Sequence, residues 1–280
     1  MRRRKLRLAA VSGTAVLAAV CASGSEFAGA GSVPDPGPLP AERYETTAED
    51  HQRSQRATAL LVRRCMADRG HPDFPLDPRY PDDPVVGAAV VVTGSGAVDL
   101  DDARRWGYGW DPEQSPAVRP QGRRMTAAEY ADYPACSAAA GRRLMRGIDV
   151  ERDWAYPSRR SIAVDKAVER DPRARAAWAA WSRCMGEQGF ERYPTPVAAY
   201  TDDAWRRGDD GNTRHTRRER ATAVADVTCK LRHRTTEIVH AVEAGKQAAD
   251  IARHPGRYAA ALRSLETYRD NIADVLRKLG

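Results

Sequence analysis

Two stretches of the chain show the three-and-four spacing of apolar residues that is typical of amphipathic helices. Over residues 47–69 the apolar face consists of Ala57, Leu61, Val62, Cys65 and Met66. A second helix is expected to begin at Asp171-Pro172, because an N-cap residue followed by proline favours a helix start. Its apolar face carries Trp178, Trp181, Cys184 and Met185. Both patterns predict a helix whose buried face includes a cysteine followed by a methionine.

The ends of these two helices repeat one motif. Arg64-Cys65-Met66, Gly70 and Phe74-Pro75 align with Arg183-Cys184-Met185, Gly189 and Tyr193-Pro194, with five identities in 12 aligned positions. Each glycine can adopt the left-handed conformation that closes a helix, and the proline that follows turns the chain. We interpret the motif as an internal repeat, so two helical halves of related construction are expected.

The C-terminal region has the most regular pattern. Tyr258, Leu265, Ile272 and Leu279 are spaced seven residues apart, and the same spacing runs through residues 224–252. His254-Pro255-Gly256 interrupts it, which predicts an antiparallel helical hairpin. The seam packs inside the molecule in one interpretation and pairs with a second copy in the other, and the sequence leaves the oligomeric state open.

The region before Cys136 is less regular. Val85 to Thr93 is short and rich in β-branched residues, so we expect a minor extended segment near residues 85–110. Thr126 and Glu129 form a capping-box pattern at the start of a helix that carries Cys136. The predicted fold is therefore mainly α. Its first helical half spans residues 43–150, its second spans 158–280, and the two share one core.

Residues 1–30 have the layout of a secretory signal peptide. A basic stretch precedes an apolar run of 13 residues, Leu8 to Val20, which is shorter than the ~20 residues of a transmembrane helix. Cleavage fits after Ala30 or earlier, at Val20-Cys21-Ala22. The residues before Cys21 also resemble a lipobox, so lipidation of Cys21 is the alternative. Residues 31–42, rich in Pro and Gly, are expected to form a flexible tether.

Four cysteines follow the leader: Cys65, Cys136, Cys184 and Cys229. An even number without C-x-x-C spacing indicates disulfides in an exported chain, rather than a metal site. Three pairings are open on spacing alone. We favour Cys65–Cys136 and Cys184–Cys229, because a repeated motif should make the same local link twice. We expect no metal and no cofactor.

The net charge of +7 overstates how basic the exported protein is. Residues 1–30 hold five basic residues and one acidic residue, and without them the net charge is +3. This mild, mixed charge argues against a nucleic-acid partner. Arg214 to Arg220 is locally basic and is either a solvated helix start or a contact for anionic polymers or lipid headgroups. Otherwise, membrane contact is expected only through a lipid anchor.

The most unusual local sequence is Arg105-Trp106-Gly107-Tyr108-Gly109-Trp110. In an extended conformation Trp106, Tyr108 and Trp110 would point to one face, where exposed rings could stack on the sugars of a cell-wall glycan. These three residues and Arg105 are the candidate ligand surface. The rings could instead cover a small core, with the glycines allowing close backbone approach, or contact an envelope protein.

With this stretch and its two Cys-Met-x3-Gly-aromatic segments, the chain resembles a group of exported actinobacterial proteins and lipoproteins of unknown function. The resemblance covers most of the chain after the leader. It implies a location outside the cell or on the outer face of the cytoplasmic membrane, together with disulfides. It implies no activity.

No catalytic motif stands out. Gly94-Ser95-Gly96 lacks the flanks of a nucleophile elbow, and the histidines do not form H-E-x-x-H. The sequence therefore favours a non-catalytic binding or scaffold protein of the envelope or the extracellular space. The alternative is an extracellular hydrolase of cell-wall material. A deep pocket with converging carboxylates or histidines would favour the hydrolase, and a shallow aromatic face the binding protein.

Overall fold

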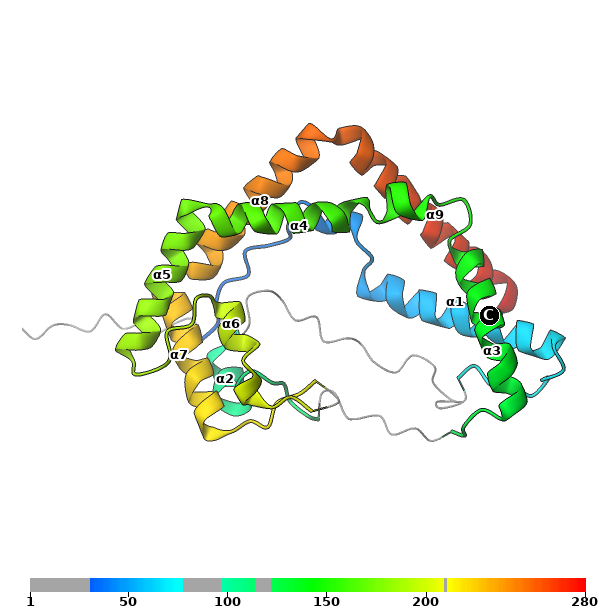
Figure 1. The fold of residues 1–280 in the computed structure, drawn as a ribbon, viewed down its shortest axis with the longest axis horizontal. Coiled ribbons are helices and arrows are strands. Elements are labelled where there is room, and N and C mark those ends of the chain that lie inside the picture. The colour runs from blue at the N-terminus through cyan, green and yellow to red at the C-terminus, as the bar shows by residue number, and fades with distance from the viewer. Residues whose placement is uncertain (1–30, 78–96, 114–121, 209–210) are drawn as a thin grey trace, which may run out of the picture. The chain divides into compact units, whose positions relative to one another are not determined.

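Helices make up most of the chain that the structure describes. A computed structural model describes residues 31–77, 97–113, 122–208 and 211–280 (Figure 1). These ranges contain nine α-helices: α1 (Ala48–Asp68), α2 (Leu100–Trp106), α3 (Ala127–Leu144), α4 (Tyr156–Arg170), α5 (Pro172–Glu187), α6 (Pro196–Tyr200), α7 (Arg217–His233), α8 (Thr235–Arg253) and α9 (Pro255–Leu279). They also contain two short 3-10 helices, η1 (Glu42–Tyr44) and η3 (Asp203–Trp205), and a π-helix, η2 (Val150–Trp154). The mainly α fold is confirmed.

Extended structure in the described ranges is limited to one isolated bridge, between Ser32 and Asp99. The β-branched stretch from Val85 to Thr93 lies outside the described residues. Part of the extended segment expected near residues 85–110 is helical instead, because Leu100–Trp106 form α2. Asp99 caps this helix by accepting hydrogen bonds from the amides of Asp101 and Asp102. Within the same ranges, no helix is long and apolar enough to cross a membrane.

The two Cys-Met helices, α1 and α5, end in the same way. Gly70 and Gly189 have positive φ angles of 93° and 84°. His71 N donates to Met66 O, and Phe190 N donates to Met185 O, so both helices close with the same backbone hydrogen bond. The aromatic residues that follow, Phe74 and Tyr193, are both buried. The structure thus supports an internal repeat that extends beyond sequence identity.

Each Cys-Met helix packs against at least two other helices. Helix α1 contacts α3 and α9, and α5 contacts α7 and α8. The disulfide Cys65–Cys136 joins α1 to α3, and Cys184–Cys229 joins α5 to α7, with Cα atoms 5.6 and 5.7 Å apart. Both predicted pairings are confirmed. The cross-linked partners α3 and α7 both begin with a capping box, the second of which, Thr216 with Glu219, the sequence analysis missed.

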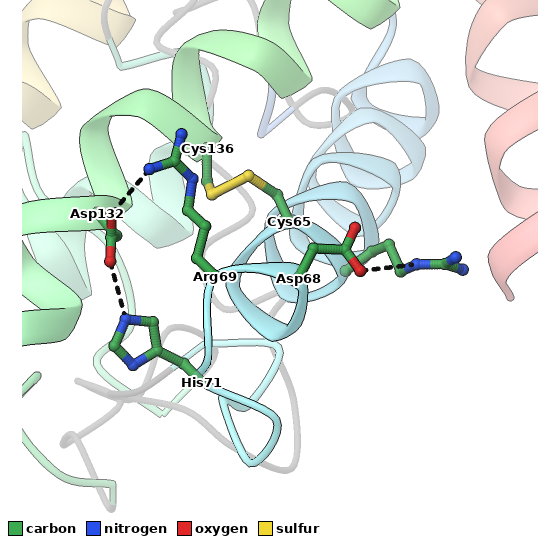
Figure 2. Close-up of a disulfide and its surroundings, with 7 residues drawn as sticks. Cys65, Asp68, Arg69, His71, Asp132 and Cys136 are labelled. Atoms are coloured by element: carbon green, nitrogen blue, oxygen red, sulfur yellow. Dashed lines mark hydrogen bonds and ion pairs between the residues drawn. A yellow bond between two sulfur atoms is a disulfide. The ribbon is translucent and has the colours of Figure 1, made fainter.

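Side-chain bonds accompany each disulfide. Figure 2 shows Asp132, on α3, between two residues that follow the first Cys-Met helix: Arg69 Nη1 donates to Asp132 Oδ1 at 2.8 Å, and His71 Nε2 lies 3.0 Å from Oδ2. His71, and then Arg69, lower the pKa of the Asp132 carboxyl. Beside the second disulfide, Gln188 Nε2 donates to Cys229 Sγ at 2.8 Å. A polar residue near each helix end therefore reinforces each covalent link.

The C-terminal helices contact one another, as the hairpin prediction requires. The chain breaks at His254 as expected, and it also breaks at Arg234, whose left-handed conformation separates α7 from α8. Three of the four seam residues of α9 named above are buried, Leu279 is partly exposed, and Ile272 packs with Ala57 of α1 and Leu144 of α3. The seam therefore serves internal packing in this structure.

Buried hydrophobic residues of the described ranges form four clusters. The largest combines residues of both predicted halves: Tyr108 comes from the first, and Trp181 and Trp205 come from the second. The first half holds a smaller cluster around the Cys65–Cys136 link. A third combines α1, α3 and α9, and a fourth combines α4, α5 and α8. The two predicted halves therefore meet in two places: α2 packs against α7, and α9 packs against α1 and α3.

Residues 31–42, predicted as a flexible tether, contact the body along their length. Val33 N donates to Val98 O, and Ala41 N donates to Gln247 Oε1 on α8. His240 Nε2, also on α8, lies 3.0 Å from Gly37 O. In this structure the segment therefore lies along the folded helices.

One buried carboxylate connects three helices. Asp250 of α8 is 1% exposed and accepts hydrogen bonds from Arg160 Nε and Nη2 of α4, at 3.0 and 2.5 Å. It also accepts one from the Tyr258 hydroxyl of α9 at 2.9 Å. The bonds from Arg160, with that from Tyr258, lower the pKa of Asp250 to about 2.

Asp250→Asn tests this link through its pH dependence. Because the folded pKa of about 2 lies below the unfolded value of ~3.9, ionised Asp250 contributes stability that is present above pH ~4 and is lost as the pH falls towards 2. We expect the variant to be less stable than the wild type at neutral pH, and the difference in unfolding free energy to shrink below pH ~4. Urea unfolding across this range measures it. Asp270→Asn, an exposed change on α9, is the control, and the same pH profile for both variants would contradict the expectation.

Candidate functional site

The aromatic-glycine stretch follows α2 and lies against the segment that precedes α7. Gly107 ends α2 with a φ of 65°. Tyr108 N donates to Glu219 Oε1 at 3.0 Å. Trp110 N donates to Asn212 Oδ1, and Asn212 Nδ2 donates back to Trp110 O, both at 3.0 Å. Side chains from residues 212–219 thus hold the backbone of this stretch in place.

Close backbone approach explains both glycines in the stretch. A Cβ atom on Gly107 would lie 2.6 Å from Glu219 Oε1. A Cβ atom on Gly109 would lie 2.3 Å from Asn212 Oδ1 and 2.6 Å from Thr213 Oγ1. These distances are too short for any real side chain, so each position requires glycine in this arrangement.

The four residues of the candidate ligand surface do not form one exposed row. Tyr108 is 2% exposed, and its ring centroid lies 5.4 Å from that of Trp205. Trp106 is partly exposed and meets the His215 ring edge-on, Trp110 is partly exposed, and Arg105 is exposed. Because α2 is helical up to Trp106, the alternation of an extended chain is not present. Tyr108 therefore covers the core, and glycan stacking stays a prediction for Trp106 and Trp110.

A buried ion pair lies on α7, the helix against which α2 packs. The side chains of Asp226 and Lys230, one turn apart on α7, are both 0% exposed, with Lys230 Nζ 2.9 Å from Asp226 Oδ2. Lys230 Nζ also donates to Ala97 O at 2.8 Å, and Trp181 Nε1 donates to Asp226 Oδ1 at 2.9 Å. This network ties α5 and the start of the α2 segment to α7.

Burial dominates the titration of this network. Desolvation raises the pKa of Asp226 and lowers that of Lys230, and the mutual attraction of the two groups opposes both shifts. Desolvation, followed by the charge of Asp226, raises the pKa of the Tyr108 hydroxyl. Perturbed groups of this kind occur at active sites and in structural networks alike. Neither charged side chain reaches solvent, so the pair can orient helices but cannot meet a substrate as it stands.

Sequence reasoning missed Glu219, Asp226 and Lys230. Asp226 and Lys230 have the i, i+4 spacing that is common on solvated helix surfaces, so their burial left no distinct signal. Glu219 could have been found from Thr216, three residues before it, since this is the same capping-box pattern as at Thr126.

One exposed hollow of the described surface lies beside the aromatic-glycine stretch's helix, α2, and is shallow. It has a volume of about 370 Å³ and lies between α2, the end of α5 and the first turns of α7. Its lining includes Arg104, Arg217 and Arg220, and contains no carboxylate and no histidine. Elsewhere in the described ranges, no three His, Cys, Asp or Glu side chains are placed to hold a metal ion together. The geometry that would favour a hydrolase is thus not present in this hollow.

Comparisons with known proteins give no assignment. No protein-family model, no curated protein and no solved structure matches the chain. A functional proposal therefore depends on the residues and contacts of this chain alone.

Gly109→Ala tests the close approach of the aromatic-glycine stretch to residues 212–219. We expect a loss of about 2 kcal/mol in the free energy of unfolding, because the added methyl group must displace Asn212 and Thr213. Gly245→Ala, inside α8 with open space around the new Cβ, is the matched control and should be neutral or stabilising by up to ~1 kcal/mol. Denaturant unfolding measures both, and equal stability of the two variants would refute the packing argument.

Proposed function

We propose that this chain is exported and that it acts as a non-catalytic binding or scaffold protein in the cell envelope or the extracellular space. The observation that carries the proposal is the pair of disulfides, which link cysteines 71 and 45 residues apart. Such bonds persist outside the reducing cytosol. Each adds about 4 kcal/mol of stability on the chain-entropy model, so the fold depends on an oxidising location.

The leader supports export. Residues 1–30 lie outside the described part, and their basic stretch, apolar run and small residues are those of a signal peptide. Cleavage after Ala30 gives a secreted protein, and lipidation of Cys21 gives one anchored on the outer face of the membrane. The resemblance to exported actinobacterial proteins points to the same location.

The placement of polar chemistry supports binding over catalysis. A catalytic acid or base must come within hydrogen-bond reach of a substrate, and Asp226 and Lys230 are enclosed. Exposed or partly exposed side chains around α2 and α7 include the arginines of the shallow hollow and the rings of Trp106 and Trp110. These groups can hold an envelope ligand, such as a wall glycan or an envelope protein, without transforming it.

Export is tested by expressing the full chain in an actinobacterial host and measuring the intact mass in each cell fraction. We expect the protein outside the cytoplasm with its leader removed or with a lipid on Cys21. N-ethylmaleimide should label the folded protein only after reduction, and then at the four cysteines of the two disulfides.

The matched control is the chain without residues 1–30, which should stay in the cytoplasm with reduced thiols. Recovery of the full-length chain from the cytoplasm, leader intact and thiols open to labelling without reductant, would refute export.

A further inference from the structure

The shallow hollow on α7 combines positive charge with an apolar floor. Arg104 of α2 lines it together with Arg217 and Arg220 of α7, and Phe190 and Val224 also line it. Both apolar residues are partly exposed and pack against the largest hydrophobic cluster. Its volume of about 370 Å³ is at the small end of the ~300–1,000 Å³ of ligand pockets.

The charge in the hollow is largely uncompensated. Arg104 pairs with Asp101, with Nη1 2.6 Å from Oδ1. Neither Arg217 nor Arg220 forms an ion pair within the ranges that the structure describes. The first turn of α7 contains three arginines and Glu219, and the Glu219 carboxylate is buried against Tyr108 N and Thr213. The outward face of this turn is therefore cationic.

These arginines occupy positions that folding alone does not favour. The N-terminus of a helix carries partial positive charge. Cations in the first turn therefore lower the stability of the helix, and an anion bound there raises it. Arg217 is the first residue of α7, and its side chain is exposed. A bound anion would interact with the guanidinium groups and with the helix end together.

The position of Arg104 is fixed by buried contacts to α7. Lys230 holds Ala97 O just before α2, and Glu219 holds Tyr108 N just after it. Both holding residues are fully buried. The two contacts set α2 against α7, so the third arginine of the hollow comes from a second, anchored helix.

The geometry points to a binding site for a phosphate group that carries an apolar chain. Guanidinium groups bind phosphate oxygens in pairs, and Phe190 and Val224 provide contact for the first carbons of the chain. The site deepens the proposed binding function, on which it rests, but it does not depend on export. Such a ligand could be a free amphiphile or the headgroup of a membrane lipid.

Binding is measured with the purified, oxidised protein and three probes. Titration calorimetry uses dihexanoyl phosphatidylglycerol below its micelle concentration and, separately, inorganic phosphate. Cosedimentation uses vesicles of phosphatidylglycerol or of phosphatidylcholine. We expect the short-chain lipid to bind more tightly than inorganic phosphate. Binding to phosphatidylglycerol vesicles in addition identifies a membrane source, and binding to the short-chain lipid alone identifies a free amphiphile.

R217Q/R220Q should weaken binding of the short-chain lipid about tenfold or more, because two charge-assisted contacts are lost. Its fold should be retained, which circular dichroism checks, since both changes relieve repulsion at the helix start. R63Q/R232Q removes the same charge from exposed positions of α1 and α7 and should bind like the wild type.

Three results would overturn the site. The first is the absence of short-chain lipid binding, even where anionic vesicles bind. The second is inorganic phosphate that binds as tightly as the lipid. The third is an equal affinity of the two double variants. Each leaves export untouched, because the location of the protein is measured separately.

Discussion

Both halves of the molecule depend on one covalent constraint, the disulfide between a Cys-Met helix and a helix that begins with a capping box. The buried hydrophobic residues of the described ranges are divided among four clusters. A cross-link stabilises the fold by restricting the unfolded chain, whatever the size of the core beside it. Helices α8 and α9 then pack against pairs that are already fixed.

Where α2 of the first half packs on α7 of the second, buried charges position the exposed ones. Glu219 and Lys230 hold the chain on either side of α2, and Asp226 balances Lys230 in the interior. An unpaired charge at these buried positions would cost folding free energy. Each charged group of the network therefore needs its partner inside the protein. Its effect reaches the surface at the arginines of the hollow, where α2 and α7 meet. The buried residues that stabilise the packing of α2 on α7 therefore also position the arginines of the proposed binding site.

The sequence predicted what local rules determine. The repeated motif gave the helix ends and both disulfide pairings, and the proline and capping patterns gave the starts of α5 and α3. It did not predict α2, because the aromatic-glycine alternation suggested a strand while Asp99 acts as an N-cap. The burial of Asp226 and Lys230 and the convergence of Arg104 with Arg217 depend on tertiary packing, which no local pattern records. For glycines 107 and 109 the sequence suggested close backbone approach as one interpretation, and the structure shows that the approaching residues lie in 212–219.

The most direct test of this account compares urea unfolding of the oxidised protein with that of the same protein held fully reduced, each state verified by mass. The account predicts a loss of about 4 kcal/mol for each opened disulfide, which together is comparable to the whole stability margin of an ordinary domain. The reduced protein should therefore lose its cooperative transition, or unfold at a much lower urea concentration. A reduced protein that unfolds cooperatively at the same midpoint as the oxidised one would contradict it.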